Sequence, residues 1–240
     1  MLRFLALFLF FTTALPAAAN EAQIRKVMQE KLEGVQIEGI APAPLPGLWE
    51  VRYRTPRGVQ ILYTDGAATY AIQGSIHDLR NERDLTAERL RKLNAIRFDS
   101  LPFDQAVKIQ RGSGKRVLVM FSDPYCPACK QFEQTLQQVD DITVYVFMYP
   151  VIRPELAAHS KAVWCAADRG KAWLDLALRG KRPSSPANCK TPVDDIVQLG
   201  HSLGINSTPT LVFANGERVS GGFRTAAELS QALDRMAAAR

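Results

Sequence analysis

The sequence has few residues of the kinds that mark specialised proteins. Its 240 residues include 4 cysteines, 3 histidines and 3 tryptophans, and it has no long apolar run beyond the N-terminus. The missing runs exclude a multi-span membrane protein. The 30 basic and 24 acidic residues are scattered, without a Lys/Arg block, so no nucleic-acid partner is expected despite the net charge of +6. A hydrophobic fraction of 47% is that of an ordinary globular protein of one large or two small domains.

The one apolar run lies in residues 4–15, after a short positive segment that ends at Arg3. Pro16 breaks the run, and Ala17-Ala18-Ala19 has the small side chains that a signal peptidase requires. We therefore predict that residues 1–19 are a cleaved signal peptide. The alternative is an uncleaved anchor, for which the run is short. Export would place all four cysteines where disulfides form and persist.

Residues 20–82 have the pattern of a small α+β domain. The expected elements are an amphipathic helix at 21–33, a loop at 41–47, strands at 48–53, 60–63 and 69–72, and a turn at Asp65-Gly66. A sheet this small is marginal by itself and often completes its core with a second copy. We therefore expect this domain to form a homodimer.

Residues 84–95 are expected to form a helix that is charged on most faces, with Asp84 or Thr86 as its cap. Such a helix can bridge two domains in solvent. We assign residues 83–103 to a linker, and the alternative is an ordinary surface helix.

Residues 104–240 have the pattern of an α/β domain. A strand at 116–121, a helix at 126–139 and a strand at 142–148 predict a β-α-β unit with parallel strands. Helical segments follow at 155–178 and 193–203, which gives a helical insertion over about 154–203. Strands at 210–213 and 217–220 flank the turn Asn215-Gly216, and a helix at 225–239 closes the domain.

The chemistry is concentrated at Cys126-Pro127-Ala128-Cys129, between a strand and a helix. A helix N-terminus favours negative charge and lowers the pKa of a cysteine placed there. Cys126 is expected to be the exposed nucleophile, and Cys129 the more buried thiol that reaches back to it. A C-x-x-C at this place in the fold predicts redox chemistry.

A zinc site is the alternative interpretation of the motif. Structural zinc commonly takes four ligands in paired motifs, whereas Cys165 and Cys189 are far apart and the three histidines are isolated. We expect no metal and assign no catalytic histidine.

Cys165 and Cys189 flank the helical insertion. The simplest interpretation is a structural disulfide, which contributes about 3 kcal/mol in the chain-entropy model. The alternative is a second redox pair that relays electrons.

The segment Ser207-Thr208-Pro209-Thr210 precedes a predicted strand. A proline here can simply mark the strand boundary. Together with the C-x-x-C, a cis Thr208–Pro209 bond would place the Thr208 backbone opposite the redox pair, where an extended substrate chain can bind.

The strand–C-x-x-C–helix unit and the later Thr-Pro resemble the thioredoxin fold. Over essentially the whole mature chain the sequence is more similar still to the DsbC/DsbG family of periplasmic disulfide isomerases. The matching segments are Ile61–Gly66, Ile72–Gly74, Phe121–Asp123, Ala162–Ala166, Leu199-Gly200, Asn215-Gly216 and Gly221–Phe223. The departure is Pro127-Ala128, where the best-known members carry Gly-Tyr or Pro-Tyr. These two residues tune the thiolate and the balance of isomerase, reductase and oxidase activities.

The resemblance implies a fold of mixed α+β and α/β class, with a thioredoxin-like domain, a helical linker and an N-terminal dimerisation domain. It implies a periplasmic homodimer that acts as isomerase and chaperone on misfolded disulfide-containing exported proteins. A membrane thiol reductant of the DsbD type would keep it reduced, and no cofactor is needed. Family members also carry a structural cysteine pair in the helical insertion.

We therefore predict a thiol–disulfide isomerase or reductase. Cys126 and Cys129 are the expected catalytic pair, and Thr208, Pro209, Pro127 and Ala128 the expected substrate groove. The alternatives are an oxidase that donates its disulfide, a non-enzymatic holdase dimer, and rescue of oxidised single cysteines.

Overall fold

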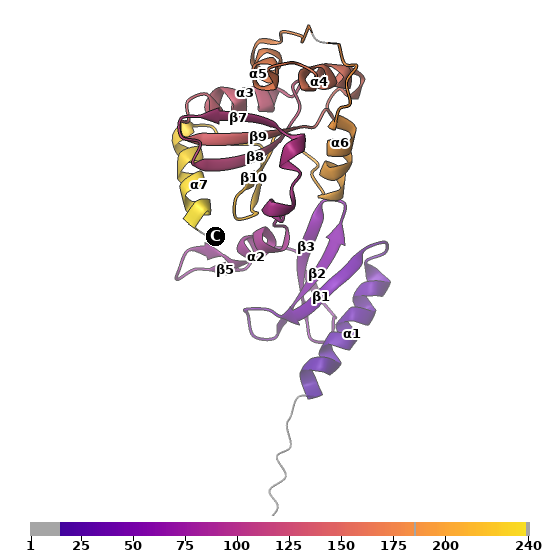
Figure 1. The fold of residues 1–240 in the computed structure, drawn as a ribbon. Helices are drawn as coiled ribbons and strands as arrows, with labels where there is room; N and C mark the ends of the chain where they lie inside the picture. Colours follow the sequence, from indigo (N-terminus) through magenta and orange to yellow (C-terminus); the bar gives the residue numbers. More distant parts are fainter. Residues whose placement is uncertain (1–14, 185, 239–240) are drawn as a thin grey trace, which may run out of the picture. The chain divides into compact units, whose positions relative to one another are not determined.

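A computed structural model describes residues 15–184 and 186–238. The chain divides into two units, one ending at Leu90 and the other beginning at Arg91, and each is described by itself. Figure 1 shows both as ribbons.

The N-terminal unit combines a long helix with a four-stranded sheet of order β1-β2-β3-β4, in which every neighbouring pair is antiparallel. Ile24 and Met28, one turn apart on the helix, pack with Val51 and Leu62 of the sheet to form its core. The elements are α1 (Leu15–Lys31), β1 (Gln36–Pro42), β2 (Leu48–Thr55), β3 (Gly58–Asp65) and β4 (Ala71–Ile72).

Strand β1 is absent from the sequence prediction, which places a loop from residue 41. A bulge between Ile37 and Gly39 breaks the alternation of apolar and polar residues that would have revealed the strand.

The predicted turn after β3 is present: the Asp65 carboxylate accepts hydrogen bonds of 2.8 Å from the N–H groups of Thr69 and Tyr70. The strand that follows is shorter than predicted.

Helix α2 (Leu85–Leu93) is capped by Asp84, whose carboxylate accepts a 2.8 Å hydrogen bond from Ala87 N. It follows a small hairpin of β5 (His77–Asp78) and β6 (Arg83–Asp84) that the sequence does not predict. Thr86 is buried, and its hydroxyl lies 2.6 Å from that of Tyr63. The division of the chain falls inside α2, and the predicted domain and linker boundaries stay predictions.

The C-terminal unit is built on a five-stranded sheet of order β11-β10-β8-β9-β7. β8 and β9 are parallel, as the β-α-β pattern predicts, and the other neighbouring pairs are antiparallel. The edge strand β7 is missed from sequence, because its five residues alternate with only two apolar side chains. The strands are β7 (Val107–Arg111), β8 (Arg116–Ser122), β9 (Ile142–Met148), β10 (Thr210–Phe213) and β11 (Arg218–Ser220).

Helices cover both faces of this sheet, and β8 is therefore buried on both sides. Leu118 and Met120 point into a core shared with α3, α4, α5 and α7, whereas Val119 and Phe121 point into a second core with α6. The helices are α3 (Pro127–Leu136), α4 (Ala157–Trp164), α5 (Arg169–Arg179), α6 (Val193–Ser202) and α7 (Ala226–Ala238), with 3-10 turns at Phe98–Ser100, Phe103–Gln105 and Pro154–Leu156. The predicted helical segment 155–178 is interrupted where Asp168 caps α5 by accepting from Lys171 N at 2.9 Å.

The predicted signal peptide lies largely outside the described residues, and the backbone of residues 15–19 forms the start of α1. α1 therefore begins earlier than the predicted helix at 21–33. Within the described ranges no helix has the length and apolarity to cross a bilayer.

Candidate active site

The redox motif lies where β8 turns into α3. The strand ends at Ser122, and Cys126 takes the N-cap position of α3 with extended backbone angles. Pro127 occupies the first helical position, where its missing N–H costs nothing. The Cys126 side chain makes no capping hydrogen bond to the N–H groups of the first turn.

Cys126 is less exposed than the sequence suggests. Its side chain is 6% exposed, so the expectation of an exposed nucleophile is wrong for this state. The thiol is turned inward, where Sγ donates a hydrogen bond of 3.3 Å to the backbone oxygen of Thr208.

Thr208 and Pro209 reach the motif because β10 pairs with β8, with Thr210 opposite Phe121. The Thr208–Pro209 bond is cis. Gly221 N donates to Pro209 O at 2.8 Å, which fixes the segment from its other side. Cys126 and Thr208, far apart in the sequence, thus become neighbours.

Pro127 and Ala128 begin the first turn of α3. Ala128 lines a small pocket together with Gln131 and Phe132 of the same helix and residues 220–224, which end β11 and begin the segment after it. The structure therefore brings the four predicted groove residues, 127, 128, 208 and 209, around the same motif. Their role in binding substrate stays a prediction.

Cys129 is the more deeply buried thiol, with 1% exposure. Burial raises its pKa to about 12, while the side chain of Ser122 and the backbone of Asp123 act in the opposite direction. At neutral pH Cys129 is therefore a protonated thiol, and it must lose its proton to become a nucleophile.

The buried carboxylate of Asp123 holds the loop before the motif. Its Oδ1 accepts from Tyr125 N at 2.8 Å, and its Oδ2 accepts from Ile152 N, beyond β9, at 2.7 Å. Its backbone oxygen accepts from Cys126 N at 3.1 Å. Asp123 thus links two loops beside the nucleophile, a role that a lone Asp in a loop does not reveal from sequence.

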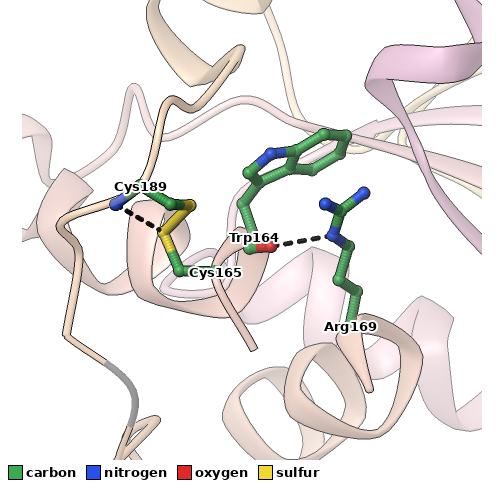
Figure 2. Close-up of a disulfide and its surroundings, with 4 residues drawn as sticks. All are labelled: Trp164, Cys165, Arg169 and Cys189. Atoms are coloured by element: carbon green, nitrogen blue, oxygen red, sulfur yellow. Dashed lines mark hydrogen bonds between the residues drawn. A yellow bond between two sulfur atoms is a disulfide. The ribbon is translucent and has the colours of Figure 1, made fainter. Parts of the chain in front are cut away.

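The other two cysteines form a disulfide, shown in Figure 2, with Cα atoms 5.8 Å apart. Cys165 lies directly after α4, and Cys189 N lies 3.3 Å from the sulfur of Cys165. Beside it, Arg169 Nε donates to Trp164 O at 2.8 Å, and its guanidinium carbon lies 3.7 Å from the centre of a Trp164 ring. The pairing leaves Cys126 and Cys129 as free thiols.

Metal-ligand clusters are not found in the described part of the chain, where no three His, Cys, Asp or Glu side chains gather as ligands.

Comparison with known proteins identifies both parts of the chain. Residues 103–237 match the model of a thioredoxin-like domain, and residues 15–87 match that of the disulfide bond isomerase protein N-terminal domain. The probable thiol:disulfide interchange protein DsbC of Bordetella pertussis is 39% identical over 198 residues, which cover 82% of this chain and 69% of that protein. The chain belongs to the DsbC family.

Other members of the family agree with this assignment. Thiol:disulfide interchange protein DsbC of Escherichia coli K12 is 28% identical over 225 residues, which cover 91% of this chain and 89% of that protein. The solved structure of a disulfide interchange protein from Neisseria gonorrhoeae is 39% identical, with a TM-score of 0.54, over 57% of this chain and 98% of its own. The predicted fold class and DsbC/DsbG resemblance are confirmed.

Two contacts of this DsbC-family site were not predicted from the sequence. The Tyr125 hydroxyl hydrogen-bonds to Nδ1 of His159 on α4, so the residue before the nucleophile is tied to the helical insertion. Glu133, on α3, accepts a hydrogen bond from Trp173 on α5. Both pairs join residues more than thirty positions apart, and neither has a local sequence signal.

Proposed function

We propose that this chain is a thiol–disulfide isomerase and reductase that acts on exported proteins with wrong disulfides. The observation that carries the proposal is the placement of Cys126 at the N-terminus of α3, with its sulfur against the Thr208 backbone oxygen. The DsbC relatives named above support the same activity.

The first step is attack of the Cys126 thiolate on a substrate disulfide. A bond forms between Cys126 and one substrate sulfur, and the other substrate sulfur leaves as a thiolate with the electron pair. The helix N-terminus stabilises the attacking thiolate. Thr208 and Pro209 bind the extended substrate chain, and the small Ala128 side chain leaves room beside the mixed disulfide.

The mixed disulfide has two outcomes. A different substrate thiolate can displace Cys126, which rearranges the substrate and regenerates the enzyme. Alternatively, Cys129 displaces the substrate, which reduces it and leaves a Cys126–Cys129 disulfide. The second outcome consumes two electrons from the enzyme, and we propose that a membrane reductant of the DsbD type restores them in the periplasm, where the predicted signal peptide would direct the chain.

The N-terminal unit supports a homodimer. It matches the disulfide isomerase N-terminal domain, and its edge strand β4 exposes Ile72, with Tyr70 just before it; these residues are 52% and 75% exposed. Large apolar side chains on an edge strand are a ready surface for a second copy. Ile72→Asp should give monomers in sedimentation, with Leu79→Asp, exposed in the same unit, as the control.

The deciding experiment is reactivation of scrambled ribonuclease by catalytic amounts of protein lacking residues 1–19, with a thiol reductant. Wild type should reactivate it, Cys126→Ala should not, and Cys129→Ala should retain part of the activity. Activity in Cys126→Ala would contradict the proposal.

Two other outcomes would favour the alternative functions. Failure of the wild-type protein to reactivate ribonuclease, together with rapid oxidation of a dithiol peptide, would indicate an oxidase instead. Suppression of aggregation that persists in Cys126→Ala/Cys129→Ala would show the proposed chaperone activity separately.

A further inference from the structure

A pocket of about 230 Å³ opens beside the redox motif, and the reaction steps proposed above do not use it. One wall is formed by Ala128, Gln131 and Phe132 of α3, and the other by residues 220–224. The two walls touch at Gly222, where a Cβ would lie 2.7 Å from the ring of Phe132. The pocket is therefore a packed feature of the site with a fixed width at its floor.

Both walls are tied to the residues that hold the nucleophile. Ala128 lies two positions after Cys126 in the first turn of α3. In the opposite wall, Gly221 N donates to Pro209 O at 2.8 Å. Pro209 follows Thr208, whose backbone oxygen accepts the hydrogen bond from Cys126 Sγ. A substrate bound to Cys126 therefore lies next to this pocket.

The pocket carries a positive charge without a matching acid. Among the described residues Arg224 is the one charged residue in its lining. Arg224 is exposed, and its guanidinium has no ion pair or hydrogen bond within the described part of the chain. The neighbouring acid is Glu228, whose Oε2 accepts from the N–H groups of Arg224 and Thr225, each at 3.2 Å. Glu228 is thus engaged by the backbone and is not part of the lining.

The neutral polar groups of the pocket suit the same kind of ligand. Gln131 and Ser220 line it, and their side chains have no hydrogen-bond partner among the residues that the structure describes. An amide and a hydroxyl can both donate, and a guanidinium binds a carboxylate with two parallel hydrogen bonds. Ala128 and Phe223 add apolar surface for a short carbon stem. A Glu or Asp side chain combines such a stem with a carboxylate.

The spacing fits a particular position in an extended substrate. Such a chain advances about 3.3 Å per residue, so side chains two positions apart point the same way and lie roughly 7 Å apart. An α-helix rises about 1.5 Å per residue, which puts Gln131 roughly 7.5 Å along α3 from Cys126. A side chain two positions from the reacting substrate cysteine therefore matches the distance from Cys126 to the pocket.

We propose that the pocket lined by Arg224 binds the carboxylate of a substrate Glu or Asp two positions from the cysteine that reacts with Cys126. The inference rests on the proposed function and adds to it a preference among substrates. Arg224 pairs with the carboxylate, while Gln131 and Ser220 donate to its oxygens. Cysteines with an acidic residue at this spacing are attacked faster than others.

The test uses short peptides with one cysteine held as its mixed disulfide with thiopyridine. Cys126 attacks the peptide sulfur and thiopyridone leaves with the electron pair, so its absorbance follows the first step alone. The leaving group is neutral and does not compete for Arg224. One peptide set carries Glu, Gln or Lys two positions before the cysteine, and a second set carries them two positions after it. Reduced protein lacking residues 1–19 is used at about 0.15 M salt, where charges further than about 8 Å away are screened.

Three variants separate the pocket from general charge. Arg224→Gln removes the cation, and Arg224→Glu reverses it. Arg153→Glu is the matched control, because Arg153 is also exposed, lies just before the 3-10 turn at Pro154–Leu156, and does not line the pocket. It changes the net charge as much as Arg224→Glu does. The rate with the Gln peptides should agree within about twofold in all four proteins, since no charge is paired there.

In one of the two sets, wild type should react about threefold faster with the Glu peptide than with the Gln peptide. Arg224→Gln should remove this difference, Arg224→Glu should make the Lys peptide the fastest, and Arg153→Glu should keep the wild-type order. Equal rates with Glu and Gln in both sets would overturn the inference. So would a Glu preference that Arg224→Gln keeps or that Arg153→Glu removes. Reaction of every peptide no faster than with free glutathione would instead contradict the proposed function itself.

Discussion

Trp173 Nε1 donates a hydrogen bond of 2.6 Å to Glu133 Oε1, and the two side chains are 0% and 2% exposed. The pair joins the helix that carries Cys129 to helix α5 of the insertion. Arg111 of β7 lies near the same carboxyl and favours its charged form. It also donates to the backbone oxygens of Leu136 and Val139, at and just beyond the end of α3. The active-site helix is thus held from both the insertion and the sheet edge.

The buried Glu133 carboxyl makes stability depend on pH. Burial raises its pKa from 4.5 to about 7, against opposing effects of Trp173 and Arg111. The folded state therefore binds more protons than the unfolded state between pH 4.5 and about 7, and stability from this group is lost as pH rises through that range. Glu133→Gln keeps an acceptor for Trp173 and removes the titration. The difference in unfolding free energy between variant and wild type should grow by about 3 kcal/mol from pH 4.5 to pH 8. Urea unfolding across this range measures it, and a constant difference would contradict the assignment.

The Asp123 carboxylate should be required for the loop before Cys126. Asp123→Asn retains one acceptor oxygen but turns an NH₂ group toward a backbone N–H, which should cost about 2 kcal/mol. Urea unfolding should show this loss, and the reaction of the Cys126 thiol with Ellman's reagent should slow. Asp104→Asn is the control, because Asp104 is exposed and should change stability by less than about 0.5 kcal/mol. Equal effects of the two substitutions would refute the role of the buried carboxylate.

Gly222 should tolerate a side chain less well than its neighbour. It has φ of +76°, and a Cβ here would lie 2.7 Å from the ring of Phe132 on α3. Gly221 has φ of +90° but nothing within 4 Å of the same atom. Gly221→Ala therefore carries only the backbone cost of about 1–2 kcal/mol, and Gly222→Ala should lose about 1–3 kcal/mol more through overpacking. Thermal unfolding of both variants gives the comparison, and equal losses would mean that Phe132 moves aside freely.

The Cys165–Cys189 disulfide should contribute to stability without taking part in the reaction. It joins residues 24 positions apart, and in the chain-entropy model its loss costs about 3 kcal/mol. Cys165→Ala/Cys189→Ala should therefore unfold at a lower urea concentration, while the rate at which Cys126 and Cys129 react with Ellman's reagent stays as in wild type. Slower thiol chemistry in the folded variant would favour the electron-relay alternative.

The hydrogen bond between Tyr125 and His159 should appear as a coupling energy. Tyr125→Phe and His159→Ala each remove one partner, and the double variant removes both. We expect an interaction term of about 1 kcal/mol in a double-mutant cycle measured by urea unfolding at pH 7.5. Additive losses would show that the two side chains stabilise the fold independently.

Local patterns predict the central strands of the C-terminal unit well, because β8, β9 and β10 are buried apolar runs with clear boundaries. β7 and β1 are missed for different reasons: β7 has too few apolar residues, and β1 is interrupted by a bulge between Ile37 and Gly39. The C-x-x-C motif marks its own chemistry. The burial of Cys126 and the contact of Tyr125 with His159 depend on tertiary packing, which spacing along the chain does not encode.

The partner of Cys126 Sγ is a main-chain atom, the oxygen of residue 208. No change of side chain at that position can delete it, so the contact belongs to the chain path and not to the identity of the residue. Because we propose that Thr208 contacts the substrate chain, position 208 is where side-chain changes should alter which peptides are accepted and still leave the nucleophile this neighbour. A saturation library at 208, selected on different client proteins, would test whether recognition varies while the contact is retained.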